Sequence, residues 1–535
     1  MATVTELSRL ALPHLSFSLL ILVYGLYLLG LVIYRLFLSP IRNIPGPKLT
    51  AVTGWYETYY DVYKGGKFIF KIEEWHQRYG PIVRINPWEV HFADPDFYDI
   101  LYSQKSRYSK LDHLKYRFGI PTSSFDTTEH SHHAFRRAAM NPFFSRQRIL
   151  QYAPYAQSQV LRLCKRFETE YKGTGKVFCF NDAWATLTTD VINYYSFAQS
   201  YNFQDYPDFI APFTNSIKEL AQSLHLVGHF PWVLSLLQSL PEALVGILNP
   251  GMVPVFQFQN SITDQIRRIM KEDAEGKTTT TEHKTVFTEL LKSDLPKEEL
   301  SLDRLRSEAL SITGGGIDTI KNALVTATYG ILSNPEIYKR LREELVAAMP
   351  DPNAEPLSIP ELEKLPYLNA IVHECLRLSY GITQRLQRLD PHSPITFGSY
   401  TLPPNTPFSM TSYIQHRNPL IFPNPDKFDP ERWLPKTPSP TPTNPSTTPS
   451  PPTTPPIAPA TGKPLSRYLV PFGRGPRACL GQNFAMAELY LDLGIVFRRC
   501  EFELFETGER EVRMARQFFA PFPEKGTRGV RGRVV

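Results

Sequence analysis

One stretch of eleven residues, Pro471 to Gly481, constrains this chain more than any other. It contains one thiol, three glycines and two arginines, and a helix-like segment, Asn483 to Leu489, follows it. Glycine lets the backbone turn and approach another group closely, because no side chain blocks it. Free N–H groups and the positive end of a helix dipole favour a thiolate beside a helix start. The stretch therefore predicts a tight loop that presents the sulfur of Cys479 as a ligand.

Part of this loop also matches a dinucleotide-binding fingerprint. Gly473 to Ala478 fits the pattern G-x-G-x-x-A, and Glu501 lies downstream like an acid that binds a ribose. However, Pro476 interrupts a phosphate-binding loop, and the chain ends at Val535, too soon for a dinucleotide-binding domain. The sequence therefore favours thiolate ligation over nucleotide binding.

The N-terminus contains a membrane-anchor pattern. Leu15 to Tyr34 is a run of 20 residues without a charged side chain, and a helix of that length spans ~30 Å, the thickness of a bilayer core. No small-residue cleavage site follows, so the pattern predicts an uncleaved single-pass anchor after a short segment, residues 1–14. Basic residues are more frequent after the run than before it, which places the rest of the chain in the cytosol: Arg35, Arg42 and Lys48 against Arg9.

Composition places the remainder among globular proteins of a reduced compartment. Apolar residues make up 42% of the chain, and a net charge of +6 does not indicate a nucleic-acid partner. The five cysteines show no paired spacing, which is typical of a reducing compartment with at most one metal-binding thiol. Helical patterns dominate and strand-like runs are few, so the fold class is predicted as mainly α with small β-sheets. Residues 82–85 and 89–92 alternate around Asn86-Pro87, which predicts a β-hairpin.

Two further segments define the domain organisation. Residues 35–47 form a basic hinge that ends in Ile44-Pro45-Gly46-Pro47, where proline prevents a helix from continuing. Residues 435–464 are mostly Pro, Thr and Ser and cannot bury enough apolar surface to order themselves. We therefore expect one catalytic domain, residues 48–535, with 435–464 as a disordered surface loop. A proline-rich docking ligand is the alternative role for that loop.

One long helix is predicted from Asp303 to Leu332, with three consecutive glycines, Gly314 to Gly316, near its middle. Each glycine costs a helix up to ~1 kcal/mol relative to alanine. The run therefore indicates either tight helix packing or a kink or groove in which a small ligand lies against the backbone.

The cysteine loop resembles the haem-binding signature of the cytochromes P450, F-x-x-G-x-R-x-C-x-G. Its fixed positions are Phe472, Gly475, Arg477, Cys479 and Gly481. The resemblance implies the cytochrome P450 fold and heme b, with Cys479 as the axial thiolate that pushes electron density toward O–O cleavage.

Other motifs occur in the order of this family. Gly315 to Thr319 resembles its oxygen-binding segment, and an alcohol beside a carboxylate can relay protons through ordered water. Asp318 and Thr319 are therefore the expected catalytic residues, although Ile320 stands where the family often has a hydroxyl. Glu374 and Arg377 match E-x-x-R, and Arg432 completes the structural cluster expected behind the haem; a surface ion pair is the alternative.

The haem propionates need cations. The resemblance offers Arg477 from the cysteine loop, Arg137 with His133 from the family's W-x-x-x-R helix, and Arg388 beyond the E-x-x-R helix. His133 replaces the tryptophan of that pattern, and its imidazole still donates to a carboxylate. Because the sequence around Leu378 to Arg385 departs from the family pattern by about one residue, Arg385 remains a rival to Arg388.

The resemblance implies a monooxygenase that inserts one atom of O2 into a lipophilic small molecule. Electrons come from NADPH through a separate NADPH–cytochrome P450 reductase, and the enzyme lies in the endoplasmic reticulum membrane with its catalytic domain facing the cytosol. Segments such as Asn141 to Ser145 resemble fungal microsomal P450s of secondary metabolism, of the trichodiene oxygenase type, which favours a terpenoid, polyketide or related substrate. Five arginines are candidates for a reductase-docking face, with a solvated surface as the alternative: Arg136, Arg146, Arg148, Arg474 and Arg498.

Two other functions are compatible with the same family resemblance. One is a reductase-independent P450-type isomerase or dehydratase, which the Asp318–Thr319 pair argues against because such members lose the acid–alcohol pair. The other is a non-catalytic haem-binding protein, which the complete cysteine signature argues against.

Overall fold

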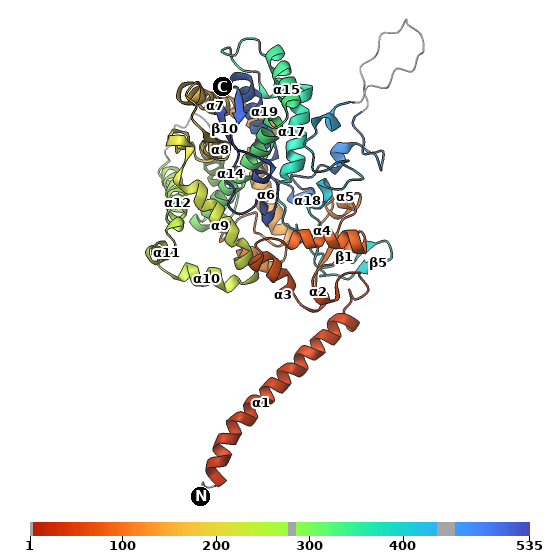
Figure 1. The fold of residues 1–535 in the computed structure, drawn as a ribbon. Coiled ribbons are helices and arrows are strands. Elements are labelled where there is room, and N and C mark those ends of the chain that lie inside the picture. The colour runs from red at the N-terminus through yellow and green to blue at the C-terminus, as the bar shows by residue number, and fades with distance from the viewer. Residues whose placement is uncertain (1–3, 277–284, 436–454) are drawn as a thin grey trace, which may run out of the picture.

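The long helix α14, Leu302–Leu332, is the element around which the other helices pack (Figure 1). It contacts α8 (Phe180–Phe197), α12 (Val253–Ala274), α17 (Pro366–Ser379) and α19 (Gln482–Arg499). The computed structural model describes residues 4–276, 285–435 and 455–535. Within them the chain is mostly helical with four small sheets, which confirms the predicted fold class.

The contact between α14 and α8 is close because small residues meet there. A Cβ atom added to Gly316 would lie 2.8 Å from the side chain of Ile192, so this glycine serves tight packing. The two helices are also joined by a hydrogen bond of 3.1 Å from the Trp184 indole to the Thr328 hydroxyl. The three glycines do not interrupt α14, which is one continuous helix. The helix therefore has no break at the position where a kink was one of the predicted possibilities.

Shorter helices complete the helical part of the domain. They are α2 (Lys48–Val52), α3 (Trp55–Thr58), the π-helix η2 (Tyr59–Tyr63), α4 (Phe68–Tyr79), α5 (Phe97–Leu101), α6 (His130–Met140), α7 (Arg146–Arg166), α9 (Pro212–His229), α10 (Pro231–Ser239), α11 (Glu242–Leu248), α13 (Val286–Leu291), α15 (Pro335–Ala348), α16 (Ile359–Leu362) and α18 (Ser412–His416).

The sheets are small and join segments that are distant in the sequence. The predicted hairpin is formed by β1 (Ile82–Arg84) and β2 (Val90–Phe92), and β6 (Phe408–Ser409) pairs with β2 in parallel. A second sheet has the order β3-β10-β7, with β3 at Phe178–Cys179, β7 at Phe502–Leu504 and β10 at Arg531–Val534. Two hairpins are separate: β4 (Ile395–Phe397) with β5 (Tyr400–Leu402), and β8 (Arg516–Phe518) with β9 (Ala520–Phe522).

The N-terminal helix α1, Val4–Ile33, projects from the body of the molecule (Figure 1). Residues Phe17–Leu38 are apolar, with a mean hydropathy of 2.3, and none of this window is buried against the rest of the chain. Length and composition therefore suit a membrane span. The following hinge is fixed to the domain: Arg35 donates to the Val52 carbonyl at 2.6 Å, and Arg84 donates to the Arg35 carbonyl at 2.9 Å.

The low-complexity segment differs partly from its prediction. Residues 436–454 lie outside the described residues. Residues 455–464 form an ordered turn in which the Ala458 amide donates to the Lys463 carbonyl at 2.8 Å. Ala458 is fully buried and packs in a cluster with Leu465 and Tyr468. This end of the segment is therefore ordered, because alanine and leucine beside the Pro/Thr tract supply the apolar surface that the tract lacks.

Helix α19, which follows the cysteine loop, buries two carboxyl groups one turn apart. Glu488 and Asp492 are both nearly inaccessible, and neither Glu488 oxygen has a hydrogen-bond partner among the described residues. Burial raises the pKa of both carboxyls well above the ordinary value, and the charge of Asp492 raises the pKa of Glu488 further. Burial therefore favours the protonated form of both carboxyl groups in the folded state.

We expect Glu488→Gln to raise the apparent Tm at pH 8 by about 3 °C and by less than about 1 °C at pH 5. The folded pKa lies above the unfolded one, so the stability of the wild type is fully present at low pH and falls as pH rises, by up to 1.4 kcal/mol per pH unit for each group. For a chain this long 1 kcal/mol corresponds to about 1 °C. Scanning calorimetry at both pH values measures the gain, with exposed Glu503→Gln as the control. Equal gains at pH 5 and pH 8 would contradict the burial argument.

Candidate active site

The cysteine loop is held by its backbone. The Cys479 amide donates to the Phe472 carbonyl at 2.8 Å. Gly475 has φ +74°, and a Cβ there would lie 2.7 Å from the Tyr102 carbonyl oxygen, so only glycine fits this turn. Gly481 is the N-cap of α19, and a Cβ on it would meet no protein atom within 4 Å. The loop is therefore packed on one side and open on the other.

The Cys479 sulfur lies on the open side. Its side chain retains accessible surface, yet the surrounding protein raises the pKa of the thiol by burial. Both facts hold if the sulfur faces an internal hollow. The Gly481 amide and the positive charge of Arg137 lower the pKa of Cys479 but do not outweigh burial. The loop and the helix start alone therefore do not produce a thiolate; a bound metal ion would, because a coordinating thiol is deprotonated.

The glycine run on α14 has one packed member and two open members. A Cβ on Gly314 or Gly315 would meet no protein atom within 4 Å, whereas Gly316 is packed against α8. The Thr319 hydroxyl donates to the Gly315 carbonyl at 2.8 Å. Gly316 thus serves tight packing, and Gly314 and Gly315 leave open space beside the backbone to which Thr319 is hydrogen-bonded.

Asp318 has a partner that the sequence reasoning missed. Its carboxylate forms an ion pair with Lys321, one turn along α14, and both side chains are partly exposed. The i, i+3 spacing could have indicated this pair. Asp318 and Thr319 are adjacent as expected, and Lys321 forms an ion pair with the Asp318 carboxylate.

Five basic side chains gather between α6, the cysteine loop and the segment before β6. They share one property: among the described residues none forms an ion pair with a carboxylate. They are His133 and Arg388, which are buried, and Lys110, Arg137 and Arg477, which are half-buried.

The electrostatics of this cluster are unfavourable without an anion. Burial lowers the pKa of Arg477 to about 9, and the charge of Arg388 lowers it further. Burial lowers the pKa of His133 to about 2, helped by Arg477, Lys110 and Arg137. The Arg477 Nε and the His133 Nδ1 are buried without hydrogen-bond partners. Buried like charges with unsatisfied donors indicate a site for an anionic group.

Arg477 and Arg137 bind backbone carbonyls in and beside the cysteine loop. Arg477 donates to the carbonyls of Thr127 and Thr128 at 2.8 and 2.7 Å. Arg137 donates to the Ala478 carbonyl at 2.6 Å, so it holds the cysteine loop directly. Lys110 was missed by the sequence reasoning; it stacks on the Phe125 ring at 3.9 Å. No local motif marks it, since its role depends on contacts across the fold.

The choice between Arg385 and Arg388 follows from their partners. Arg385 forms buried ion pairs with Glu57 and Glu89, the second at 3.0 Å, and its charge is compensated. Arg388 donates only to the Gln387 carbonyl, at 2.8 Å, and its backbone is fixed by a bridge to Phe408. Arg388 is therefore the arginine available to an anionic ligand.

Glu374, Arg377 and Arg432 form the expected cluster, and it is buried. Arg377 and Glu374 are fully inaccessible and share two hydrogen bonds, of 2.9 and 2.7 Å. The Arg432 Nε donates to Glu374 at 3.1 Å, and the Trp433 indole donates to it at 2.8 Å. Burial alone would raise the pKa of Glu374, but Arg377 and then Arg432 outweigh it, so that the pKa is lowered. The alternative of a surface ion pair is excluded.

An aromatic cluster formed by Phe118, Phe125 and Phe519 joins residues 118–125 to the turn between β8 and β9. The ring of Phe519 meets those of Phe118 and Phe125 edge to face, with centroids 4.9 and 6.0 Å apart. Phe519 is the turn residue between β8 and β9 and has φ +72°, a strained value for a phenylalanine. Its carbonyl accepts hydrogen bonds from the amides of Thr383 and Gln384, which hold the turn in place.

The five arginines proposed as a docking face are all engaged within the chain. Four contact carboxylates, and the fifth, Arg498, is buried and bound to two carbonyls, so it does not belong to a surface. Their partners reduce the positive potential of such a face: Arg136 with Glu299, Arg146 with Glu363, Arg148 with Glu289, Arg474 with Asp99, and Arg498 with the carbonyls of Met349 and Pro350.

Haem fits these residues. A thiol beside a hollow, glycines that leave room for a flat ligand, and buried cations without anions suit an iron porphyrin with two propionates. Fold and site together define a haem-thiolate protein. The chain belongs to the cytochrome P450 family, whose family model, "Cytochrome P450", matches residues 50–527.

Curated relatives agree along almost the whole chain. A cytochrome P450 monooxygenase of Eupenicillium brefeldianum is 46% identical, with 94% of this chain and 97% of the relative covered. A tryptophan 6-hydroxylase of Fusarium equiseti is 37% identical and an N-acetyltryptophan 6-hydroxylase of Emericella nidulans is 38% identical, each with 96% of both chains covered. The protein is therefore a haem-dependent monooxygenase that uses O2, a lipophilic substrate and electrons from a redox partner.

We expect Arg388→Gln to accelerate haem loss by about 10-fold, because a charge-assisted hydrogen bond to a propionate contributes ~1.5–3 kcal/mol. Transfer of haem to an excess of apomyoglobin measures the rate. Arg385→Gln should instead lower the unfolding temperature, since it leaves Glu57 and Glu89 buried without their cation. The control is Arg467→Gln, a partly exposed arginine paired with Asp99. Faster haem loss from the folded Arg385 variant than from the Arg388 variant would reverse the assignment.

Proposed function

We propose that Cys479 binds the haem iron and that the protein inserts one oxygen atom into a lipophilic natural product of fungal secondary metabolism. The observation that carries the haem assignment is the set of four cations without a carboxylate partner around the cysteine loop, Lys110, Arg137, Arg388 and Arg477, with the buried imidazole of His133 beside them. Arg477, Arg388, His133 and Lys110 would hold the propionates, and Arg137 would fix the loop. Phe472, Gly475 and Gly481 shape the loop, and Glu374, Arg377 and Arg432 stabilise the region behind it.

The bound haem supplies the activation of O2, and this chain's residues supply position and protons. The groove at Gly314 and Gly315 leaves space beside the backbone. The Thr319 hydroxyl donates to the Gly315 carbonyl, and it can release this carbonyl to bind water. Asp318, which pairs with Lys321, accepts protons from solvent and passes them toward Thr319.

The pocket favours an apolar or aromatic substrate, because Phe118, Phe125 and Phe519 meet there. This supports a terpenoid, polyketide or related compound. A second candidate is an aromatic amino acid or its N-acetyl derivative, since the names of two relatives give tryptophan and N-acetyltryptophan. Arg117, next to Phe118, favours it, since the buried Arg117 Nε has no hydrogen-bond partner among the described residues, and a free guanidinium suits a substrate carboxylate.

The setting we propose is the endoplasmic reticulum membrane, with Phe17–Leu38 as the single span and residues 48–535 as a catalytic domain on the cytosolic side. Basic residues after the span support this orientation. An NADPH–cytochrome P450 reductase in the same membrane would deliver the electrons. Because most of the proposed docking arginines already have partners, a docking reductase would compete with carboxylates of this chain.

The test of function uses the full chain with a fungal reductase in microsomes, NADPH and 18O2. The substrates are a panel of terpenes, polyketides and N-acetyltryptophan. One labelled oxygen in a product that requires both NADPH and reductase supports a monooxygenase. Turnover of a hydroperoxide without reductase would instead support the isomerase alternative. Loss of N-acetyltryptophan turnover alone in Arg117→Gln would favour the second substrate class.

We expect Thr319→Ala to uncouple the enzyme, lowering product per NADPH by about 10-fold while NADPH consumption continues, because general acid–base groups contribute ~100-fold or more when fully lost. Thr319→Ser should restore most of the coupling. Thr326→Ala is a matched control, since the Thr326 hydroxyl makes the same bond to a carbonyl one turn back on α14, at 2.8 Å. Paired assays of NADPH and product measure the ratio. Equal coupling in both alanine variants would exclude a proton-relay role for Thr319.

A further inference from the structure

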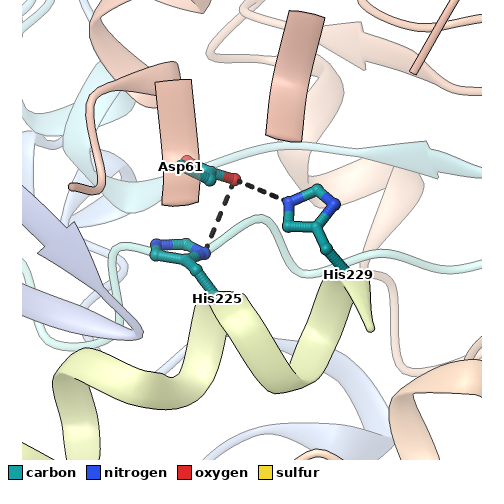
Figure 2. A group of neighbouring side chains, drawn as sticks. All are labelled: Asp61, His225 and His229. Atoms are coloured by element: carbon teal, nitrogen blue, oxygen red, sulfur yellow. Dashed lines mark ion pairs between the residues drawn. The ribbon is translucent and has the colours of Figure 1, made fainter. Parts of the chain in front are cut away.

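Three side chains with metal-binding atoms meet outside the haem region (Figure 2). Asp61 belongs to η2, and His225 and His229 lie one turn apart at the end of α9. Their ligand atoms all lie within 4.8 Å of one another. Within the described part of the chain, no other group of three such residues comes as close together.

The outer nitrogen of each imidazole is already used. The His225 Nε2 lies 2.5 Å from the Gln517 carbonyl oxygen, which only accepts, so Nε2 carries the proton. The His229 Nδ1 lies 3.1 Å from the Thr58 hydroxyl, which itself donates to the Gly54 carbonyl, so Nδ1 is also the protonated nitrogen. The inner nitrogens of the neutral rings then present lone pairs, and they face Asp61 (Figure 2). Outer hydrogen bonds of this kind orient histidines that bind metals.

The distances between the inner ring nitrogens and the Asp61 carboxylate suit ligands of one metal ion better than hydrogen bonds. The His225 Nδ1 and the His229 Nε2 lie 3.5 and 3.6 Å from the Asp61 Oδ2, beyond the range of a normal hydrogen bond. In a tetrahedral zinc site with bonds of ~2.0–2.1 Å, neighbouring ligand atoms are about 3.3 Å apart. The distances of 3.5 and 3.6 Å from the two histidine nitrogens to the Asp61 Oδ2 are close to this spacing.

The surroundings favour a cation. Asp61 is 4% exposed, and its second oxygen, Oδ1, is buried without a hydrogen-bond partner among the described residues. His229 is the last residue of α9 and His225 lies one turn before it, near the end where free carbonyls and the negative end of the helix dipole attract positive charge. Nearby, Arg385 and Arg117 carry positive charge, but Glu57 and Glu89 pair with Arg385. Among the described residues, Asp61 forms its ion pairs with the two histidines and none with an arginine.

We propose that Asp61, His225 and His229 bind one divalent transition-metal ion of the zinc class, with a water molecule as the fourth ligand. Two imidazoles and a carboxylate suit this class of ion better than Ca²⁺ or Mg²⁺. The ion joins η2 to α9 and to strand β8, because the Gln517 carbonyl belongs to β8 and the His225 ring packs on Phe518. Phe519 follows at once and belongs to the aromatic cluster of the substrate pocket.

The test is metal binding by the full-length, haem-loaded protein in detergent. The protein is treated with EDTA, equilibrated with Zn²⁺ and desalted, and zinc and iron are then counted by mass spectrometry. We expect about one zinc per haem in the wild type, and a dissociation constant at least about 10-fold weaker in His225→Gln, His229→Gln and Asp61→Asn. The exposed His392→Gln is the control and should retain zinc. Zinc-edge X-ray absorption should show imidazole scattering from ligands at ~2.0 Å.

A CO-difference spectrum confirms that each variant is folded around its haem. His229 is the most accessible of the three residues, so His229→Gln carries the test if a more buried variant does not fold. Zinc should raise the apparent Tm of the wild type and leave that of His229→Gln unchanged. Less than about a tenth of a zinc per haem in the wild type, or equal zinc in all variants, overturns the proposal. Neither outcome depends on turnover, so the site and the monooxygenase assignment are tested separately.

Discussion

Cys479→Ser should abolish the red-shifted Soret band that a thiolate-bound ferrous haem gives with CO. Loss of a residue that only hydrogen-bonds to a metal ligand typically costs roughly 10–100-fold in activity. Because Cys479 is the proposed ligand itself, product formation should fall by more than this. Serine keeps the size of the side chain, and the backbone bond from residue 479 to the Phe472 carbonyl is unaffected, so the loop keeps its shape. What is lost is the thiolate that donates electron density through the iron. Difference spectroscopy and product analysis of the variant in microsomes provide the measurements.

A matched control for this substitution is Cys179→Ser. Cys179 is half-buried in β3, and burial raises the pKa of its thiol to about 12, so it remains a neutral thiol far from any ligand role. Its spectrum and activity should equal those of the wild type. If the Cys479 variant kept a thiolate-type band, Cys479 would not be the iron ligand. The other cysteines would then have to be replaced in turn.

Glu374→Gln should prevent the accumulation of haem-loaded protein. The change leaves Arg377 without its carboxylate in a fully buried site, and breaking a buried pair by removing one partner costs about 3–5 kcal/mol. That is a large part of the 5–15 kcal/mol that typically separates folded from unfolded proteins. Soluble yield, haem per protein and apparent Tm after expression at low temperature measure the effect.

The neighbouring variant Glu431→Gln removes the same kind of charge from an exposed ion pair, so it tests whether burial is what makes the loss of Glu374 costly. Glu431 pairs with Arg340 on the surface, with both side chains about half exposed, and such pairs contribute only ~0–1 kcal/mol. Normal haem content is therefore expected in this variant. Arg377→Lys is a second variant of the cluster: it keeps the charge but loses the two-pronged bond to Glu374, so an intermediate loss is expected. Equal haem content in all three variants would show that the cluster is not needed for folding.

The sequence predicted those features of the fold and of the site that depend on residues close together in the chain. The long helix, the cysteine loop, the hairpin before residue 92 and the Glu374–Arg377 pair all follow from residues a few positions apart. The open sides of Gly314, Gly315 and Gly481 are consistent with the groove that the glycine run indicated.

Contacts across the fold could not be predicted in this way. Arg385 and Arg388 look equivalent in sequence, and only the positions of Glu57 and Glu89, about 300 residues earlier, distinguish them. The docking arginines looked free because their carboxylates are distant in the chain. The sequence shows that a helix begins just after Cys479, which favours a thiolate. The burial that raises the pKa of this thiol depends on the folded surroundings and is not visible in the sequence. Asp61 and the two histidines are likewise separated by more than 160 residues.

The fixed hinge has a kinetic consequence. A Cβ at Gly46 would lie 2.5 Å from the Arg84 carbonyl oxygen, and Arg35 and Arg84 bind the backbone on either side of the hinge, so the anchor leaves the domain at a set angle. In the proposed membrane the domain would keep one face toward the lipid. An oily substrate would then be delivered by lateral diffusion, and the quantity that saturates the enzyme would be its mole fraction in the bilayer. Adding inert phospholipid at constant total substrate would slow turnover by surface dilution.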